Sequence, residues 1–305
     1  MLNQEQTSIL VTGAAGYIGR HLVKRLLAEN RRVSVAVRES TDLTPLSSCM
    51  DRLSVFYDDG CVEHLADFMS DHHVECVVHL ATLYITYHKP SDIAPMIESN
   101  ISFGARILEA MKLAGVRNIL YSRTSWQHYL DCGYNPVNLY AAMKQAFEDI
   151  MKYYTQAEGF HSIILEIYDT YGEWDPRGKI INLFKERGRT GETIELSPGE
   201  QKLDYLYIDD IVSAFMRALD KMKADWAGEE EYALCSEELH TLKDVVSTFE
   251  KAYGVKLNIR WGAYTYRPRE IFKPYRKLEP LDGWRPVYSL RSGFERMHEK
   301  EQGDL

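Results

Sequence analysis

The sequence contains no long run of hydrophobic residues and no paired cysteine spacing. No stretch approaches the roughly 18 uninterrupted apolar residues that span a membrane, and the polar start at residues 3–7 lacks the basic and apolar regions of a signal peptide. The five cysteines are scattered without a CxxC pair, which argues against a disulfide framework and against a structural zinc site. We therefore expect a cytoplasmic protein with reduced thiols and no membrane partner.

The chain also lacks an excess of basic residues and a cluster of histidines. Its formal net charge of −9 argues against nucleic acid as the main partner. His72 and His73 are the only adjacent histidines, and adjacent side chains point apart on a helix or strand, so we expect no metal site. The 305 residues, of which 45% are hydrophobic, suffice for one large domain or two intimate ones.

A short apolar run that leads into three glycines organises the sequence. Residues 9–12 predict a strand, and Gly13, Gly16 and Gly19 have the spacing of a sharp turn into a helix. Such a helix offers unpaired N–H groups and the positive end of its dipole to an anion. The pattern predicts a dinucleotide pyrophosphate site that includes Tyr17 and Ile18, and the alternative is a glycine-rich turn without a ligand.

The residue after the second predicted strand, at residues 32–37, indicates the type of cofactor. An acidic side chain would accept a hydrogen bond from the ribose 2′-hydroxyl, whereas Arg38, about 20 residues beyond the glycines, suits a 2′-phosphate. Ser40 could donate a further hydrogen bond to that phosphate. We therefore expect NADP in preference to NAD, and the alternative is a solvated arginine in a polar loop.

The alternation of strands and helices predicts an α/β fold with a doubly wound parallel sheet. Asp58 and Asp59 follow the third strand and could cap the next helix or approach the adenine amino group. Leu80 and Ala81 end the fourth strand, on the ribose and nicotinamide side of a bound dinucleotide. Within the fourth strand, His79 is expected to be a packed residue. The predicted elements are strands at 53–57, 74–81 and 118–122, and a long helix at 93–113 that contains Asn100.

A candidate catalytic set follows the fifth strand. Tyr140 and Lys144 are four residues apart in a stretch that favours a helix, so their side chains share one face. A nearby ammonium stabilises a phenolate and so brings the pKa of the phenol closer to the pH at which the protein works. Thr124 lies at the carboxyl end of a predicted parallel strand, where ligands of such sheets bind. Its hydroxyl could hydrogen-bond the substrate oxygen that exchanges a proton with Tyr140.

These motifs resemble those of the extended short-chain dehydrogenase/reductases, the NAD-dependent epimerase/dehydratase family, most of which act on nucleotide sugars. The resemblance implies that Tyr140 is the acid or base, that Lys144 lowers its pKa and holds the nicotinamide ribose, and that Thr124 fills the Ser/Thr role. It implies a proton-relay or backbone-supporting position for Asn100, and a homodimer. The residues that carry it are Gly13, Gly16, Gly19, Asn100, Thr124, Tyr140 and Lys144.

Departures from the family pattern narrow the reaction. Ser125 and Trp126 follow Thr124 where the 4,6-dehydratases carry Asp-Glu, and Trp126 stands where the members that epimerise C3 and C5 carry a cysteine. The candidate reactions that remain are simple hydride transfer and 4-epimerisation. The segment 166–182 is similar to that of the CDP-abequose and CDP-paratose synthases, which are 4-reductases.

The C-terminal third is expected to hold a nucleotide-diphosphate sugar. Ser125, Lys179 and Asn182 are substrate candidates, and Leu203 stands where many family members carry an arginine. Arg267 could contact the diphosphate in a bidentate manner, or pair with a surface carboxylate. The segment 281–286 is expected to pack, and Asp209 or Asp210 to cap a helix. The expected domains are a dinucleotide-binding domain at 1–165, to which 205–225 returns, and a smaller substrate-binding domain at 166–204 and 226–305.

The sequence thus predicts an NADPH-dependent reductase of the C4 keto group of a nucleotide-linked 4-keto-6-deoxysugar. The first alternative is a nucleotide-sugar 4-epimerase with tightly bound NAD. The second is a non-catalytic dinucleotide-sensing protein, which the presence of both Tyr140 and Lys144 disfavours.

Overall fold

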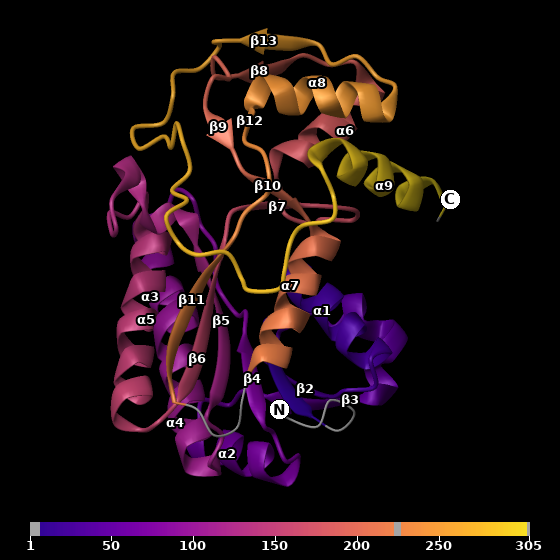
Figure 1. The fold of residues 1–305 in the computed structure, drawn as a ribbon. Coiled ribbons are helices and arrows are strands. Elements are labelled where there is room, and N and C mark those ends of the chain that lie inside the picture. The colour runs from indigo at the N-terminus through magenta and orange to yellow at the C-terminus, as the bar shows by residue number, and fades with distance from the viewer. Residues whose placement is uncertain (1–6, 223–226, 304–305) are drawn as a thin grey trace.

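A seven-stranded parallel sheet forms the centre of the computed structural model, which describes residues 7–222 and 227–303 (Figure 1). The strands lie in the order β11-β6-β5-β4-β1-β2-β3, and every neighbouring pair is parallel. The sheet is the doubly wound α/β fold that the sequence predicts. Its strands are β1 (Ser8–Thr12), β2 (Arg32–Val37), β3 (Leu53–Tyr57), β4 (Cys76–His79), β5 (Asn118–Thr124), β6 (His161–Ile167) and β11 (Gly228–Leu234).

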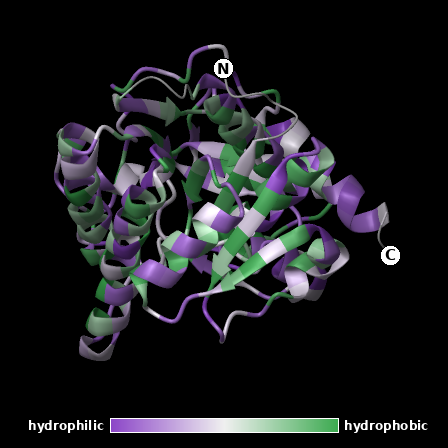
Figure 2. Ribbon diagram, turned by 90° about the horizontal axis from the view of Figure 1, so that it is seen from below, coloured by the Kyte–Doolittle hydropathy of each residue, from purple (hydrophilic) through white to green (hydrophobic). Residues whose placement is uncertain are grey.

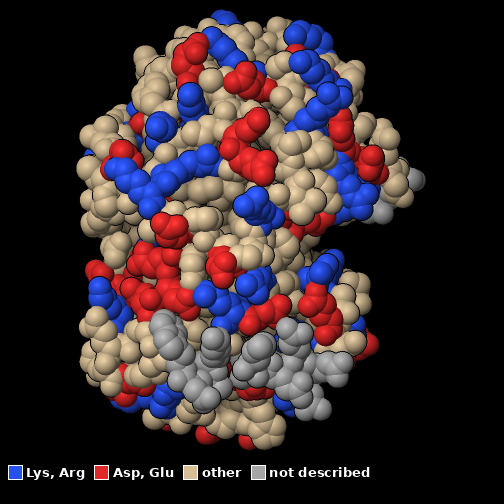
Figure 3. Space-filling model, viewed as in Figure 1, with Lys and Arg blue, Asp and Glu red and all other residues tan. Residues whose placement is uncertain are grey.

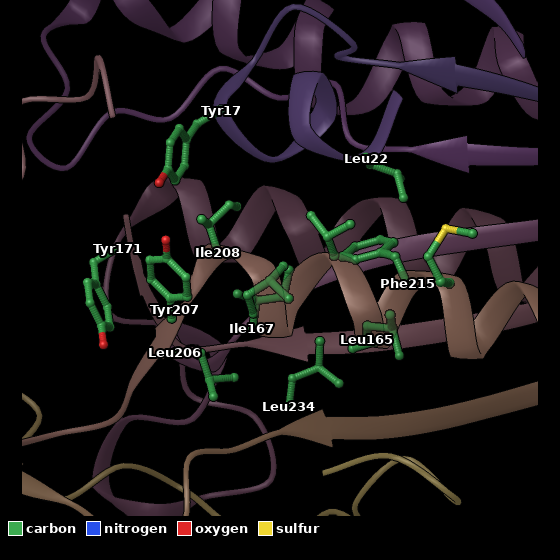
Figure 4. Close-up of a cluster of buried hydrophobic side chains, with 14 of the residues drawn as sticks. Tyr17, Leu22, Leu165, Ile167, Tyr171, Leu206, Tyr207, Ile208, Phe215 and Leu234 are labelled. Carbon is green, nitrogen blue, oxygen red and sulfur yellow. The ribbon is translucent and has the colours of Figure 1, made fainter. Parts of the chain in front are cut away.

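Helices cover both faces of the sheet because its strands are hydrophobic on both sides. Ile9 and Val11 of β1 pack in the core on the side of α1 (Tyr17–Ala28) and α7 (Ile208–Lys221). Leu10 packs in the other core, with α2 (Val62–Asp71), α4 (Phe103–Ala114) and α5 (Leu139–Ala157). Figure 2 shows the hydrophobic strands between these helices. Figure 4 shows Leu165, Ile167, Leu234 and Phe215 together in the first core.

The elements from β7 onward, apart from α7 and β11, form a smaller upper part of the molecule (Figure 1). They make three two-stranded sheets, β10 with β7, β12 with β9 and β13 with β8. Helices α8 and α9 pack against each other through Phe249 and Phe294, whose ring centroids are 5.5 Å apart. The elements are β7 (Asp169–Tyr171), α6 (Ile180–Thr190), β8 (Ile194–Leu196), β9 (Lys202–Leu203), β10 (Tyr205–Tyr207), β12 (His240–Thr241), α8 (Leu242–Tyr253), β13 (Ile259–Trp261) and α9 (Leu290–Gly303).

The expected long helix at 93–113 is divided into three pieces. It consists of α3 (Ile93–Ile97), a π-helical turn (Glu98–Ser102) and α4. Short 3-10 helices occupy Thr44–Arg52, Pro90–Asp92, Ser125–Gln127 and Tyr129–Asp131. Among the described residues no helix is long and apolar enough to cross a membrane.

The strand β11 lies beyond the expected domain boundary at residue 226 but belongs to the main sheet. This strand pairs with β6 along its whole length and is therefore an edge strand of the main sheet. Its first half reads Gly-Glu-Glu-Glu, and acidic side chains gather over β11 and α5 on the face shown in Figure 3. An edge strand can carry such charges on its open side. The sequence of β11 therefore lacks the apolar pattern from which a buried strand is predicted.

Neither aspartate at the start of α7 caps that helix. Its N-cap is Tyr207, without a side-chain capping bond. Asp210 accepts hydrogen bonds from the backbone N–H groups of Val287 (2.8 Å) and Tyr288 (3.1 Å) instead. These bonds fasten the closing segment to α7. The expectation that this segment packs is confirmed, because Trp284 is buried and its Nε1 donates to Ser213 Oγ at 2.9 Å.

Candidate active site

A cavity of about 950 Å³ opens at the carboxyl end of the sheet. Ligands of doubly wound folds bind at this edge. The predicted residues that line it are Gly13, Gly16, Tyr17, Ile18, Gly19, Arg38, Asp58, Leu80, Ala81, Thr124, Ser125, Tyr140, Lys144 and Lys179. Five predicted residues, all in the described part of the chain, are not in its lining: Ser40, Asp59, Asn100, Asn182 and Arg267.

The glycine-rich turn between β1 and α1 lines the cavity. Gly13 has a φ of +66°, and a Cβ atom there would lie 2.6 Å from the backbone nitrogen of Ala81. Gly16 is the N-cap of α1 and has no side-chain capping bond, and the first turn of α1 contains no acidic residue. The helix therefore presents its positive end to the cavity without a competing side chain, which fits a diphosphate.

Two arginines lie at the cavity wall near β2 and β3. Arg38 is exposed, and its backbone N–H donates to Thr41 Oγ1 at 3.1 Å. Arg106, which the sequence analysis missed, pairs with Asp58 at 3.0 Å and with Glu98 at 2.8 Å. Asp58 is thus held by an arginine and does not cap α2, whose N-cap is Cys61.

Asp59 and Ser40 lie close in sequence to Asp58 and Arg38 but are not in the cavity lining. Asp59 accepts from the backbone N–H of Cys61 at 2.9 Å and pairs with His64 at 2.6 Å, so it shapes the turn before α2. Its side chain does not cap that helix. Ser40 is exposed, two residues beyond Arg38, and lies outside the cavity lining.

Thr124, Tyr140 and Lys144 line the same cavity. Thr124 ends β5, and its Oγ1 accepts from the backbone N–H of Trp126 at 3.3 Å. Asn138 caps α5 by accepting from the backbone N–H of Ala141 at 3.0 Å, which sets Tyr140 in the first turn. Lys144 Nζ donates to the Ser122 carbonyl at 2.8 Å and lies 6.0 Å from the Tyr140 ring centroid.

Burial acts against the charged forms of both residues. It raises the pKa of the Tyr140 phenol, which a hydrogen bond with Thr82 and the charge of Arg177 lower in part. It lowers the pKa of Lys144 to about 7, against the effect of the nearby Glu148 carboxylate. The charge of Arg177, which also lines the cavity, thus lowers the pKa of the phenol, opposite to the effect of burial.

Asn100 supports the loop that follows β4. Its Oδ1 accepts from the Leu83 backbone N–H at 2.6 Å and from Thr82 Oγ1 at 3.1 Å, and its Nδ2 donates to the Leu83 carbonyl at 3.0 Å. Because Thr82 also contacts Tyr140, Asn100 holds the neighbourhood of the phenol in place without lining the cavity.

Arg177 is the main residue that sequence reasoning missed. It lies on the cavity wall, and its Nη2 bonds Asp175 Oδ2 at 2.6 Å and Thr170 Oγ1 at 2.9 Å. Asn182 Nδ2 donates to the carbonyls of Asp175 (2.7 Å) and Arg177 (2.9 Å), so it shapes this loop instead of lining the cavity. The Gly, Pro and charged residues at 172–179 were the available signal, since such segments pass over sites.

Arg267 does not line the cavity. Its Nε and Nη2 each bond Glu270 at 2.8 Å, so the guanidinium is paired with a carboxylate, although this carboxylate is buried and does not lie on the surface. Its guanidinium carbon lies 5.4 Å from the ring centroid of Trp126, which does line the cavity. Arg267 therefore stands behind the wall, whereas Lys179 lies on it and reaches Asp169 at 3.4 Å.

Aromatic rings lie at the Tyr140 end of the cavity. Tyr84 meets Tyr140 edge to face, with centroids 5.0 Å apart, and lies 5.9 Å from Trp126. Both Tyr84 and Trp126 line the cavity. This end thus combines an apolar wall with the hydroxyl groups of Thr124 and Tyr140, a combination that suits small polar ligands with apolar faces.

A parallel sheet with a glycine turn, and a Thr, Tyr and Lys set in the same cavity, define a nicotinamide-dinucleotide enzyme of the short-chain dehydrogenase/reductase type. The family model of the NAD dependent epimerase/dehydratase family matches residues 9–234, and the chain belongs to that family. It is an enzyme of the nucleotide-sugar epimerase and reductase group.

Two curated relatives and one solved structure illustrate the likeness. The chain is 27% identical to CDP-abequose synthase of Salmonella muenchen, over 95% of this chain and 96% of that one. It is 25% identical to dTDP-4-dehydro-6-deoxyglucose reductase of Escherichia coli, over 97% and 98%. The Thermus thermophilus UDP-glucose 4-epimerase complex with NAD is 25% identical, with a TM-score of 0.82 over 98% of this chain and 100% of that one.

Proposed function

We propose that this protein uses NADPH to reduce the C4 keto group of a nucleotide-linked 4-keto-6-deoxysugar. The observation that carries the proposal is one cavity that is lined by the glycine turn and Arg38 and also by Thr124, Tyr140 and Lys144. The Ser125-Trp126 pair after Thr124 supports reduction over dehydration, because no carboxylate stands there to eliminate water. The names of the relatives, CDP-abequose synthase and dTDP-4-dehydro-6-deoxyglucose reductase, agree with a reductase.

In the proposed reaction the chain supplies the proton and the orientation. The reduced nicotinamide, when bound, supplies a hydride to C4. Tyr140 donates its phenolic proton to the former carbonyl oxygen, and the Thr124 hydroxyl donates a hydrogen bond to the same oxygen. Lys144 holds the nicotinamide ribose and favours the resulting phenolate by its charge. One hydride and one proton thus convert the ketone to an alcohol.

The rest of the cofactor site follows the cavity wall. We propose that the turn with Gly13, Gly16, Tyr17, Ile18 and Gly19 holds the diphosphate. Arg38, helped by Ser40, takes the 2′-phosphate, and Asp58 and Asp59 stand near the adenine. Leu80 and Ala81 line the ribose and nicotinamide side. Preference for NADPH fits a reaction that consumes reduced cofactor in every turnover.

We propose that the upper part of the molecule binds the nucleotide sugar. Lys179 and Arg177 are the cations on that side of the cavity, and Ser125 lies beside Thr124 on its wall. The segments 1–165, 205–222 and 228–234 then serve the cofactor, and the remaining C-terminal segments serve the substrate. We also propose a homodimer in solution, which light scattering would test.

A 4-epimerase with tightly bound NAD is the second candidate. The observation that favours it is the likeness to the Thermus thermophilus UDP-glucose 4-epimerase complex with NAD. Such an enzyme needs the same Thr, Tyr and Lys set but retains its cofactor through the cycle. Purified protein that carries stoichiometric NAD and interconverts UDP-hexoses would establish this candidate and overturn the reductase.

The reductase is tested by following absorbance of the reduced nicotinamide with CDP-, dTDP-, GDP- and UDP-linked 4-keto-6-deoxysugars. We expect NADPH to be consumed with one of them. Tyr140→Phe removes the proton donor and should lower kcat by ~10²–10⁴-fold. Tyr153→Phe, at an exposed position of the same helix, is the matched control and should leave kcat unchanged. No consumption of NADPH with any of the four classes would overturn the proposal.

A further inference from the structure

An irregular segment, residues 264–277, lies against the loop 125–135 that follows the catalytic strand. Neither helix nor strand occurs in it, and it runs from β13 to the bridge between Ala233 and Pro280. Cations of the segment meet rings and acids of the loop. Arg269 lies 4.2 Å from the Tyr129 ring centroid and bonds Asn135, Lys277 pairs with Asp131 at 2.8 Å, and Arg267 lies over Trp126.

His128 stands in the middle of this contact. Its buried ring stacks on Tyr275 of the segment, with centroids 4.1 Å apart and an interplanar angle of 16°. Its Nε2 lies 2.7 Å from Glu166 Oε2, and its Nδ1 lies 3.1 Å from the Cys132 carbonyl oxygen. Both ring nitrogens face oxygens that only accept hydrogen bonds, so both contacts are satisfied only when the ring is doubly protonated and positively charged.

Glu166 joins this histidine to the catalytic strand. It lies on β6 directly beside Arg123 of β5, whose Nε is 3.2 Å from Glu166 Oε2. The next residues of the two strands, Thr124 and Ile167, line the cavity. The Tyr168 hydroxyl lies 2.8 Å from Glu166 Oε1 and also contacts the Tyr275 carbonyl, so these two acceptors share its one proton. Tyr275 is therefore held through both its ring and its backbone.

We propose that His128 is a positioning residue that docks segment 264–277 behind the cavity wall on the substrate side. This inference rests on the proposed function and names the residue on which binding of the nucleotide sugar depends. The docked segment places Arg267 over Trp126, and Trp126 is part of the cavity wall beside Thr124. The glycine turn and Arg38 lie outside segment 264–277 and the loop 125–135. The loss of His128 therefore weakens binding of the nucleotide sugar and leaves binding of NADPH unchanged.

The docking should weaken as the pH rises. Burial opposes the charge of the ring, but the hydrogen bond and charge of Glu166 outweigh it and raise the pKa of His128. The charged pair is therefore complete below this pKa and is lost as the pH rises through it. The other charged or titratable groups around His128 and its partners are Arg123 (β5), Glu148 (α5), Glu231 (β11), Tyr168, Cys235, and Tyr275 and Lys277 of the segment.

The test compares wild-type protein with His128→Gln, His128→Phe and Tyr275→Leu. Phenylalanine keeps the stack and loses both hydrogen bonds, whereas Tyr275→Leu removes the stack and keeps His128. His73→Asn is the control, because His73 is outside the segment and the loop and has a φ of +51°, which asparagine tolerates. The measurements are KM for the nucleotide sugar, KM for NADPH, kcat, and hydrogen exchange of segment 264–277 in the ligand-free protein.

We expect KM for the nucleotide sugar to rise ~10-fold or more in the His128 variants, the usual effect of losing a hydrogen bond to a charged group. KM for NADPH and kcat should change less than twofold, and exchange in the segment should become faster. In the wild type, KM for the sugar should rise with pH, and in His128→Phe it should be high at every pH.

Unchanged exchange in all three variants, or equal increases in both KM values, would overturn the inference. A variant that does not fold is recognised by its melting curve, and the other two then decide the outcome. If the wild type reduces no nucleotide sugar, the proposed function fails, and hydrogen exchange still decides the docking role of His128.

Discussion

The Tyr140 phenol and the Lys144 ammonium are both buried, and this sets the form in which each would enter the proposed reaction. A raised pKa keeps Tyr140 protonated at neutral pH, which is the form that a reductase needs as a proton donor. Burial lowers the pKa of Lys144 to about 7, so near neutral pH an anionic neighbour increases the fraction of Lys144 that is charged. Glu148 stands one helical turn away, and burial raises its pKa to about 7, so this pair is sensitive to ligands that bring negative charge.

The exposed guanidinium of Arg38 gives the most direct test of cofactor choice. In Arg38→Ser we expect the Kd for NADPH to rise ~10–100-fold, because a charge-assisted hydrogen bond to the 2′-phosphate is lost. The Kd for NADH should change less than threefold, since NADH has no such phosphate. Titration of nicotinamide fluorescence measures both constants. Equal effects on the two cofactors would contradict the assignment.

His79 is fully packed and titrates far from its usual range. Burial, with a smaller contribution from the charge of Lys144, lowers the pKa of His79 to about 3, and its Nδ1 lies 2.8 Å from Thr12 Oγ1. Between pH 6.5 and 3 the unfolded chain binds a proton at His79 that the folded chain does not. Stability therefore falls as the pH falls through this window, by up to ~1.4 kcal/mol per pH unit from this residue.

In His79→Gln the free energy of unfolding should fall less steeply with falling pH than in the wild type. Urea unfolding at several pH values between 7 and 4 measures it. His73→Asn, at a position outside the core, serves as the control and should keep the wild-type slope. Equal slopes in His79→Gln and the wild type would show that another group dominates the acid response.

At the scale of elements, the junction of β1 and α1 is the most constrained part of the cofactor site. Gly13 combines a positive φ with contact to the backbone of Leu80 and Ala81 at the end of β4. A side chain there would be strained and would also push β4 away from β1. Gly60 also has a positive φ, of +85°, but a Cβ atom there would meet nothing within 4 Å.

Comparison of Gly60 with Gly13 separates the cost of backbone strain, which both positions share, from the cost of a steric clash, which only Gly13 of the two has. Gly60→Ala should cost ~1–2 kcal/mol of unfolding free energy, which is the usual penalty of the left-handed region. Gly13→Ala should cost more and should also weaken NADPH binding, because the turn that faces the diphosphate must shift. Denaturant unfolding and cofactor titration measure the two effects. Equal costs at both positions would show that the turn tolerates a methyl group.

The π-helical turn between α3 and α4 shows how a local device serves the site. It places Asn100 so that three hydrogen bonds reach Thr82 and Leu83 in the loop after β4. Periodicity predicts one helix over 93–113, because a single π-turn shifts the pattern by only one residue. The polar contacts that the turn makes possible are visible only in the folded chain.

For the whole molecule, the cavity lies between the end of the sheet and the upper segments, so its ligand contacts distant parts of the chain. NADPH at 100 times its Kd should raise the free energy of unfolding by ~2.7 kcal/mol and the melting temperature by several degrees. The same concentration of NADH should raise the melting temperature less. Thermal unfolding with each cofactor measures this, and a larger shift with NADH would favour the epimerase.

The sequence by itself determined the parts of this protein that depend on local order. The doubly wound sheet is confirmed, as is membership of the family, because strand hydrophobicity and glycine spacing are properties of neighbouring residues. Thr124, Tyr140 and Lys144 were predicted from a strand end and an interval of one helical turn, and they share one cavity. Their chemical roles are still predictions.

Only the tertiary structure decided the partners of the charged residues. Arg267 pairs with Glu270 and leaves the cavity wall to Arg177, although both arginines follow irregular, charged segments in the sequence. The acidic strand β11 joins the sheet, and His128 meets Tyr275, which is distant in the chain. Ion pairs, edge strands and ring stacks depend on which segments the fold brings together, and local sequence patterns do not contain that information.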